Sequence, residues 1–285
     1  MPNIVAATDF STRSQRAFRR AGQLARQIGA ELTLVHVVDD DQPAAMVASE
    51  QREAGKFLDE QIETLDELRG LPCRALLTMG EPFDGILRAA ETASADLIVM
   101  GSHRKQILRD IFVGTTIERV IRAGPYPVLM VNADPGQPYR SVMAGIDMSE
   151  PSAHALKTAI GLGLVNDRSL TVVHAFIAVA AGKLYVANAR RDQIDDYIAS
   201  ERHVASEALF AFLKEQGLGN AQWSYRIEEG DAPAVISRAV NETGSDLVVI
   251  GTHGRSGIVK LLIGSVAEQV LRNLDVDILA VPPRR

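Results

Sequence analysis

Hydrophobic residues recur along the chain in short unbroken runs. Two of them are ELTLVHVV at residues 31–38 and SLTVVHAF at 169–176. Runs without polar alternation are typical of strands that are buried on both faces of a parallel sheet. Between the runs, apolar residues recur at helical spacing and predict amphipathic helices. One such stripe comprises Ala17, Ala21, Leu24, Ala25 and Ile28.

The pattern occurs twice. IVAATDFS at residues 4–11 parallels VMAGIDMS at 142–149, and SADLIVMGSH at 94–103 parallels GSDLVVIGTH at 244–253. The offset between matched residues is 138 in the first pair and 150 in the second. The second copy therefore carries twelve additional residues, which fall between the second and third strands of the repeat.

Each copy reads as strand, helix, strand, helix, strand, helix, strand, loop, helix, strand. This alternation predicts an α/β fold in which each copy forms a doubly wound, Rossmann-like parallel sheet with right-handed crossovers. The polar segment NADPGQPYR at 132–140 is rich in turn residues and is predicted to be a linker. We therefore expect one domain over residues 1–132, the first repeat, and another over 140–285, the second repeat.

Composition and net charge limit which partners and which cellular location are expected. The 285 residues are 46% hydrophobic and 23% charged, with a formal net charge of −6, so nucleic acid and anionic membranes are not expected as partners. The longest apolar runs are shorter than the ~18 residues that a spanning helix requires. Cys73 is the single cysteine, which excludes an internal disulfide. With no signal-peptide pattern at the start, a cytoplasmic location is expected.

Candidate chemistry lies where the fourth strand of the second repeat ends. The segment GTHGRSGIVKLLIGS places Gly251, Gly254 and Gly264 ahead of a predicted helix that begins near Ser265. Glycine permits a positive φ and a close approach of the backbone to a ligand, because no Cβ is present. The free N–H groups and positive dipole end of the helix attract an anion. Together they predict a phosphate-binding loop.

A carboxylate is predicted beside this loop. Asp147 ends the first strand of the second repeat, and ligands of doubly wound sheets bind beyond the carboxyl ends of the strands. If the first and fourth strands are neighbours, Asp147 and Gly251 border one crevice. The carboxylate could then hold a ribose hydroxyl or a phosphate-bound metal ion.

Local structure offers another explanation for the same residues. Ser265 with Glu268, and Thr115 with Glu118, match the S/T-x-x-E capping box that stabilises a helix start. A strand-end aspartate can likewise cap the next helix. The joint placement of these residues around one predicted crevice favours a ligand site.

Histidines occupy matched positions in the two repeats without metal-ligand spacing to other ligating residues. We expect supporting or packing roles for them. The pairs are His36 with His174 and His103 with His253.

The spacing Gly251-x2-Gly254-x9-Gly264-Ser265, with Asp147 and the strand VVHAF, resembles the ATP-binding type of the universal stress protein family. The resemblance covers both repeats, as in tandem members. It implies a five-stranded parallel sheet of order 3-2-1-4-5 in each repeat. It also implies that the adenosine end meets Asp147 and Ala175, and that the phosphates are held by Gly251, Gly254, Gly264, Ser265 and Val266. Arg255, within the loop, is a further candidate for phosphate contact.

The first repeat departs from this pattern. Arg104 stands where the resemblance requires the second glycine, so its side chain is expected to collide with a triphosphate or to meet a phosphate oxygen. We expect an impaired or altered site there. The residues at matching positions are Asp9, Val37, Gly101, Gly114 and Thr115.

The resemblance also implies pairing through the last strands, residues 128–131 and 278–281. Fusion of the repeats would allow this pairing within one chain as a pseudo-dimer, and a homodimer of chains stays possible. The leading functional hypothesis is a stress-response protein that uses occupancy by ATP or a related adenine nucleotide, with or without Mg²⁺ near Asp147, as a signal.

Two other functions remain open. The loop lacks the P-loop lysine and no second carboxylate is poised to activate water, so turnover is expected to be slow or absent. A slow ATP hydrolase or phosphoryl-transfer enzyme is the first alternative, and a nucleotide-free interaction scaffold is the second. The inserted stretch 181–194 is expected to carry a feature particular to this chain.

Overall fold

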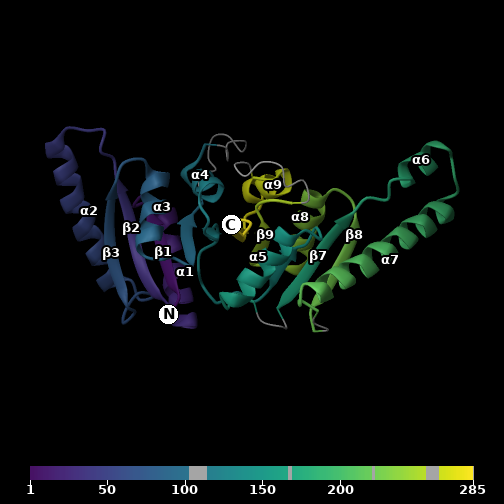
Figure 1. Ribbon diagram of the computed structural model, residues 1–285, viewed down its shortest axis with the longest axis horizontal. Coiled ribbons are helices and arrows are strands. Elements are labelled where there is room, and N and C mark those ends of the chain that lie inside the picture. The colour runs from purple at the N-terminus through teal and green to yellow at the C-terminus, as the bar shows by residue number, and fades with distance from the viewer. Residues whose placement is uncertain (103–113, 166–168, 220–221, 255–262, 285) are drawn as a thin grey trace.

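The computed structural model describes residues 1–102, 114–165, 169–219, 222–254 and 263–284. Within them, ten strands form one continuous sheet that runs the length of the molecule (Figure 1). In chain order the strands are β1 (Asn3–Thr8), β2 (Glu31–Val38), β3 (Cys73–Met79), β4 (Leu97–Gly101), β5 (Val128–Val131), β6 (Val142–Gly145), β7 (Leu170–Phe176), β8 (Ser224–Glu229), β9 (Leu247–Gly251) and β10 (Asp277–Val281).

The strand order across the sheet is β3-β2-β1-β4-β5-β10-β9-β6-β7-β8. Each half therefore has the order 3-2-1-4-5 that the resemblance implied, with the parallel pairing that the apolar runs predicted. The halves meet where β5 pairs antiparallel with β10, with Met130 opposite Ile278 and Val128 opposite Ala280. The last strands thus pair within one chain, which is the arrangement expected of a pseudo-dimer.

Helices cover both faces of the sheet and explain why its inner strands are mainly apolar, whereas the edge strand β8 carries Arg226, Glu228 and Glu229. Side chains of α1, α2, α5 and α7 pack with one face, and those of α3, α4, α8 and α9 pack with the other. Along β1, Ile4 and Ala6 face the first set while Val5 and Ala7 face the second. The helices are α1 (Thr12–Ile28), α2 (Ala44–Thr64), α3 (Pro82–Thr92), α4 (Thr116–Ala123), α5 (Glu150–Gly161), α6 (Ala181–Val186), α7 (Arg191–Glu215), α8 (Ala232–Thr243) and α9 (Ser265–Asn273).

The predicted stripe of α1 is confirmed. Four of its members are at most 2% exposed, and Ile28, in the last turn, packs partly buried against the same core. Among the described helices, none combines the length and apolar character needed to cross a membrane.

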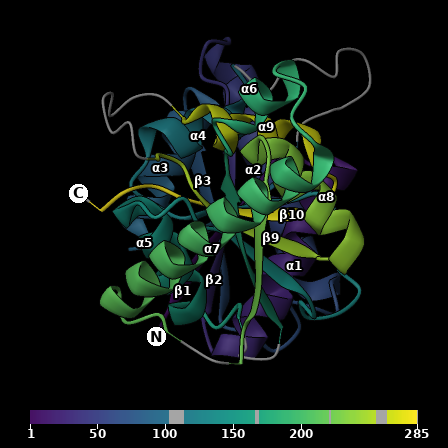
Figure 2. The same ribbon diagram turned by 90° about the vertical axis from the view of Figure 1, so that its right-hand side faces the viewer.

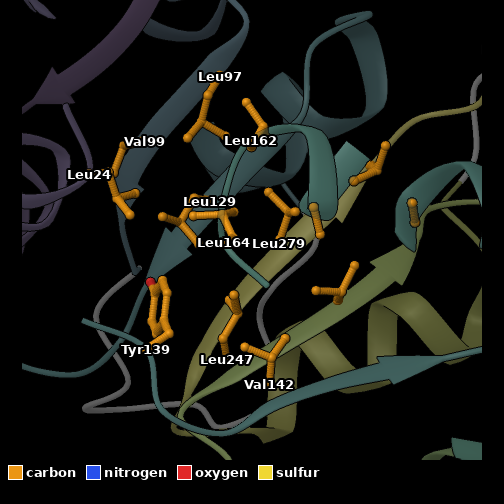
Figure 3. Close-up of a cluster of buried hydrophobic side chains, with 14 of the residues drawn as sticks. Leu24, Leu97, Val99, Leu129, Tyr139, Val142, Leu162, Leu164, Leu247 and Leu279 are labelled. Atoms are coloured by element: carbon orange, nitrogen blue, oxygen red, sulfur yellow. The ribbon is translucent and has the colours of Figure 1, made fainter. Parts of the chain in front are cut away.

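The core is continuous across the junction of the repeats. Leu129 of β5 and Leu279 of β10 are fully buried and lie among side chains of both halves (Figure 3). Leu162 and Leu164, which follow α5, reach into the same cluster. The two repeats are therefore held together by a shared apolar interior as well as by strand pairing.

The predicted linker is fastened by a buried carboxylate. Asp277, at the start of β10, accepts hydrogen bonds from the backbone N–H groups of Asn132 and Ala133 and, at 2.6 Å, from the hydroxyl of Tyr139. The Arg20 guanidinium of α1 lies 3.2 Å from the same carboxylate. Burial and the neighbouring Asp277 raise the pKa of Tyr139 well above its ordinary value, so this phenol stays a neutral donor. The segment joining the repeats is consequently fixed in place.

The region between β7 and β8, which holds the twelve additional residues, forms an arm. After β7 the chain extends outward to α6 and returns along the 25-residue helix α7, at the end of the molecule that faces the viewer in Figure 2. Ala178, Ala181 and Ile194 form a small apolar cluster of their own at the tip. Residues 181–194, the stretch expected to carry a feature particular to this chain, comprise α6 and the first turn of α7.

Candidate functional site

The two repeats leave their first strand through the same turn. Asp9 directly follows β1, whereas Asp147 lies two residues beyond the end of β6 and does not end the strand as predicted. The residues that follow the aspartates, Phe10 and Met148, have left-handed φ values of 59° and 60°. Non-glycine residues adopt this conformation only where the surroundings enforce it. Its recurrence at matched positions shows that both repeats build the same strand exit.

Both aspartates stabilise this turn. The Oδ1 atom of Asp9 accepts a hydrogen bond from the N–H of Ser11, and that of Asp147 accepts one from Ser149, each at 3.0 Å. Ser11 and Ser149 are then the N-caps of α1 and α5. The aspartates therefore position the capping serines and are not the caps themselves.

The carboxylate of Asp9 is held in its charged form. Burial alone would raise its pKa, but hydrogen bonds from the side chain and backbone of Ser11 and from the side chain of Ser14 outweigh burial and lower the pKa below its ordinary value. Asp9 is consequently an anion at neutral pH.

The matched histidines support the neighbouring backbone. The Nδ1 atom of His36 lies 2.9 Å from the carbonyl oxygen of Thr8, and that of His174 lies 2.7 Å from the carbonyl oxygen of Ile146. This geometry agrees with the predicted supporting role. Within the described residues, no group of three His, Cys, Asp or Glu side chains is arranged to hold a metal ion.

The glycines at the fourth strand are required by close packing. A Cβ added to Gly251 would lie 3.0 Å from the carbonyl oxygen of Pro151 in α5, and one added to Gly254 would lie 2.7 Å from Oδ2 of Asp147. The expectation of a positive φ is wrong for these glycines and for Gly264, whose φ is −61°. The groups that lie close to these glycines therefore belong to the protein itself. One of them is the Asp147 carboxylate, which was predicted to contact the ligand.

The loop of the second repeat is closed at its neck. The N–H of Gly264 donates to the carbonyl oxygen of Thr252 at 2.8 Å, and Thr252 is only 1% exposed. Gly264 is the N-cap of α9, and Ser265 is its first helical residue. The predicted capping box of Ser265 with Glu268 is therefore wrong.

Within the part of the chain that the structure describes, no side-chain hydrogen bond caps the start of α9, and the start is called open in this sense. The first N–H groups of any helix lack a partner within that helix. Here the residues that carry them include Ser265 and Val266, both exposed at the surface. Gly251, Gly254 and this helix start thus lie along one chain segment at the edge where Asp147 ends its turn. Arg255, the remaining loop candidate, lies outside the described residues, as do Arg104 and His103.

The corresponding helix in the first repeat is capped. Thr115 is the N-cap of α4, and its hydroxyl accepts a hydrogen bond from the N–H of Glu118. The Glu118 carboxylate in turn accepts from the N–H of Gly114 at 3.2 Å and lies 3.4 Å from Arg122. The capping interpretation is correct for this repeat, and an internal carboxylate already occupies the helix start.

A cavity of about 340 Å³ opens at the carboxyl ends of β1, β2 and β4 in the first repeat. Four of the five residues predicted there line it, namely Asp9, Val37, Gly101 and Thr115; Gly114 is not among its lining residues. In the second repeat, Ala175 lies near the end of β7, at the position that matches Val37.

One charged residue that lines this cavity was not predicted from the sequence. Arg13, in the first turn of α1, lines it and is partly buried. Its position just after the capping serine was the available signal, because the helix that follows the first strand begins at the ligand edge of a doubly wound sheet. The matching residue of the second repeat is Pro151.

Comparison with known proteins agrees with this architecture. The model of the universal stress protein family matches residues 1–132 and 138–282. Universal stress protein E of Escherichia coli strain K12 is 23% identical, over 99% of this chain and 94% of its own length. A universal stress protein of Mycolicibacterium smegmatis is 25% identical, over 99% and 97% of the two chains.

A solved structure has the same fold. The crystal structure of a universal stress protein from Archaeoglobus fulgidus aligns with a TM-score of 0.69 at 18% identity and covers 98% of each chain. Two repeats of the predicted strand order, each matched by the family model, account for nearly the whole molecule. The chain belongs to the universal stress protein family.

Proposed function

We propose that the second repeat binds ATP or a related adenine nucleotide and that occupancy serves as a signal in a stress response. The observation that carries the proposal is the open start of α9, which no side chain of the helix caps. It follows a loop neck whose Gly254 packs against the Asp147 carboxylate. A carboxylate beside an unoccupied helix N-terminus suits a ribose at one end and phosphates at the other.

The roles of the residues follow from this arrangement. Asp147 would accept a ribose hydroxyl, Ala175 would border the adenosine, and the N–H groups of Ser265 and Val266 would face phosphate oxygens. Magnesium commonly binds through one or two carboxylates together with the phosphates of a nucleotide. With the ion bound, Asp147 would be its protein ligand in place of the ribose contact, and the ion would neutralise part of the phosphate charge.

Binding without rapid turnover is the form of the function we favour. The segment 251–265 contains no acidic residue and no GK[ST] sequence, so it offers neither a carboxylate base nor the P-loop lysine. Oδ1 of Asp147 is engaged by Ser149. These features support a nucleotide sensor over a hydrolase.

The proposal is tested by thermal unfolding with and without ATP. A ligand selective for the folded state raises the melting temperature, and we expect such a rise for the parent chain. Gly254→Arg should remove most of it, because a side chain at this position displaces Asp147. Gly136→Arg is the matched control, since Gly136 has open space around it in the linker. It should keep the full rise.

Two outcomes would support the alternatives. A parent chain that is not stabilised by ATP and carries no adenine nucleotide in native mass spectrometry would support the scaffold function. Phosphate release that is lost in both Asp147→Ala and Gly254→Arg would support the hydrolase, whereas release that is unchanged in both would indicate a contaminating enzyme.

A further inference from the structure

The continuous sheet ends at β8, and within the residues that the structure describes no strand pairs with the outer side of this strand. The N–H of Gly230, just beyond β8, donates to the carbonyl oxygen of Phe176 in β7 at 2.9 Å. Because the backbone groups of a strand point alternately to its two sides, the N–H and C=O groups of Ile227 and Glu229 point away from β7. The outer side of β8 therefore presents donors and acceptors to which a further strand can pair.

The charges on the α8 side of β8 are balanced. The Arg226 guanidinium lies 2.5 Å from the carboxylate of Glu228 and 2.5 Å from that of Glu242 in α8. The Glu228 carboxylate also lies 2.6 Å from the guanidinium of Arg238 in α8. The two positive and two negative groups sum to zero, so this side of the edge carries no net charge that would repel a second copy.

One symmetric register matches these charges. If β8 pairs antiparallel with β8 of a second copy about a two-fold axis at Ile227, Arg226 of each copy lies opposite Glu228 of the other. Moving the axis by one residue places Arg226 opposite Arg226, or Glu228 opposite Glu228, and like charges directly opposite each other are destabilising. With the axis at Ile227, the Tyr225 hydroxyl also comes opposite the Glu229 carboxylate, a donor facing an acceptor.

The other edge of the sheet lacks this self-complementarity. Arg74 is the single charged residue of β3, so no axis on that strand brings opposite charges together.

Apolar side chains near β8 also favour a partner at this edge. The ring of Phe210 in α7 packs against Tyr225, with ring centroids 4.8 Å apart, and Phe210 is 46% exposed. The arm projects beyond β8 in the direction in which the sheet would continue (Figure 1). It carries four more exposed apolar side chains, those of Ile177, Val179, Tyr185 and Val186. A second copy joined at β8 would lie beside these groups and remove part of their surface from water.

We infer that this protein forms a homodimer in which β8 pairs antiparallel with β8 of a second copy, about a two-fold axis at Ile227, so that the two ten-stranded sheets become one. The molecule already contains a junction of this kind, because β5 and β10 join its two halves by antiparallel pairing. The dimer does not involve a nucleotide and is independent of the proposed function.

Sedimentation equilibrium of the full chain without nucleotide measures the association. The parent should be a dimer. Arg226→Glu places a glutamate opposite Glu228 of the other copy, and Glu228→Arg places two arginines opposite each other, so each variant should weaken association at least about tenfold. Arg74→Glu makes the same charge change on β3 and should leave the dimer intact. A monomeric parent, assemblies larger than two, or loss of the dimer in Arg74→Glu would overturn the inference.

Mixing the two variants separates contact between copies from damage within one copy. Each variant loses an ion pair with α8, and mixing cannot repair that loss. In a mixed dimer, however, both glutamates of the Arg226→Glu chain face both arginines of the Glu228→Arg chain. An equimolar mixture should therefore recover the dimer that neither variant forms alone. A mixture that stays monomeric, although the melting temperature of each variant shows that it is folded, would contradict the inference.

Cysteine cross-linking locates the two-fold axis. Ile227 is the residue of β8 that lies opposite itself in the inferred dimer. Ile227→Cys in a Cys73→Ser chain should therefore form an intermolecular disulfide when a mild thiol oxidant is added. Glu229→Cys is the matched control, because it points to the same side of the strand but lies opposite Tyr225 of the other copy. It should stay largely unlinked, and cross-linking equal to that of Ile227→Cys would exclude the inferred register.

Discussion

The loops that follow β4 and β9 share a position in the fold but differ in how the next helix begins. In the first repeat, Thr115 caps α4 and Glu118 returns to the N–H of Gly114, whose φ is 87°. In the second, Gly264 precedes α9 with an ordinary φ and its N–H closes the loop neck on Thr252. The comparison teaches that the matched glycine N–H at a helix start can be satisfied by a side-chain carboxylate in one repeat and by a backbone carbonyl in the other.

The packing of α3 on β2 and the packing of α8 on β7 differ in a compensating way. In the first repeat a Cβ on Gly85 of α3 would lie 2.6 Å from Val37 of β2. At the matching positions the second repeat has Val235 on α8 and Ala175 on β7, so the larger side chain has moved from the strand to the helix. The repeats thus conserve packed volume while changing which element supplies it.

The largest effect is expected from Gly101→Ala. The new Cβ would lie 2.6 Å from the backbone oxygen of Arg13, which cannot rotate away, whereas the gap at Gly251 is 3.0 Å. We expect Gly101→Ala to lower the free energy of unfolding by about 3 kcal/mol and Gly251→Ala to lower it by about 1 kcal/mol. Thermal unfolding checks this, and a greater loss in Gly251→Ala would contradict the packing argument.

A double substitution tests the exchange of bulk. Gly85→Val should cost about 2 kcal/mol, because the new side chain overlaps Val37. Combining it with Val37→Ala copies the second repeat and should recover most of the loss. Denaturant unfolding of the parent, both single variants and the double variant gives the coupling energy. Additive losses would show that the two positions do not compensate.

A smaller difference is expected at the helix starts. Thr115→Ala removes a side-chain cap and should destabilise the chain by about 1 kcal/mol. Ser265→Ala replaces an exposed first-turn residue and should change stability by less than about 0.5 kcal/mol. Urea midpoints of the two variants provide the measurement, and equal losses would argue that Ser265 caps α9 after all.

The smallest effect concerns pH. Because the pKa of Asp9 is lowered in the folded state, its contribution to stability is fully present above its unfolded pKa near ~4 and is lost as the pH falls through the folded value. Asp9→Asn should therefore be less stable than the parent at pH 7, by less than about 1 kcal/mol because the group is partly exposed. The melting temperatures of the two proteins should converge once the pH lies below the folded pKa of Asp9, and a gap that stays constant would exclude the carboxylate as its cause.

The architecture could be predicted because it depends on local patterns of apolar residues and on the repetition of whole segments. Apolar runs identified the strands, and the duplicated segments required the same strand order in both halves. Side-chain detail was less accessible, since Thr115 and Ser265 share one S/T-x-x-E pattern and only the first caps its helix. That choice depends on where the Gly264 N–H bonds, which is a contact across the loop neck.

Contacts between segments that are distant along the chain could not be predicted from the sequence. Asp277 begins a strand and gives no sign that Arg20, Asn132 and Tyr139 converge on it. Arg13 likewise looks like an ordinary first-turn residue until the sheet brings β2 and β4 beside it. In both cases the information lies in tertiary placement and not in spacing along the chain.

The antiparallel pairing of β5 with β10 has a consequence for whether the two repeats can exist as separate chains. Neither half can be removed without baring an apolar strand to any neighbouring polypeptide. Separate copies would have to find each other by diffusion, and their association would weaken as expression falls. Fusion makes the encounter intramolecular, so the paired state no longer depends on how much protein the cell makes.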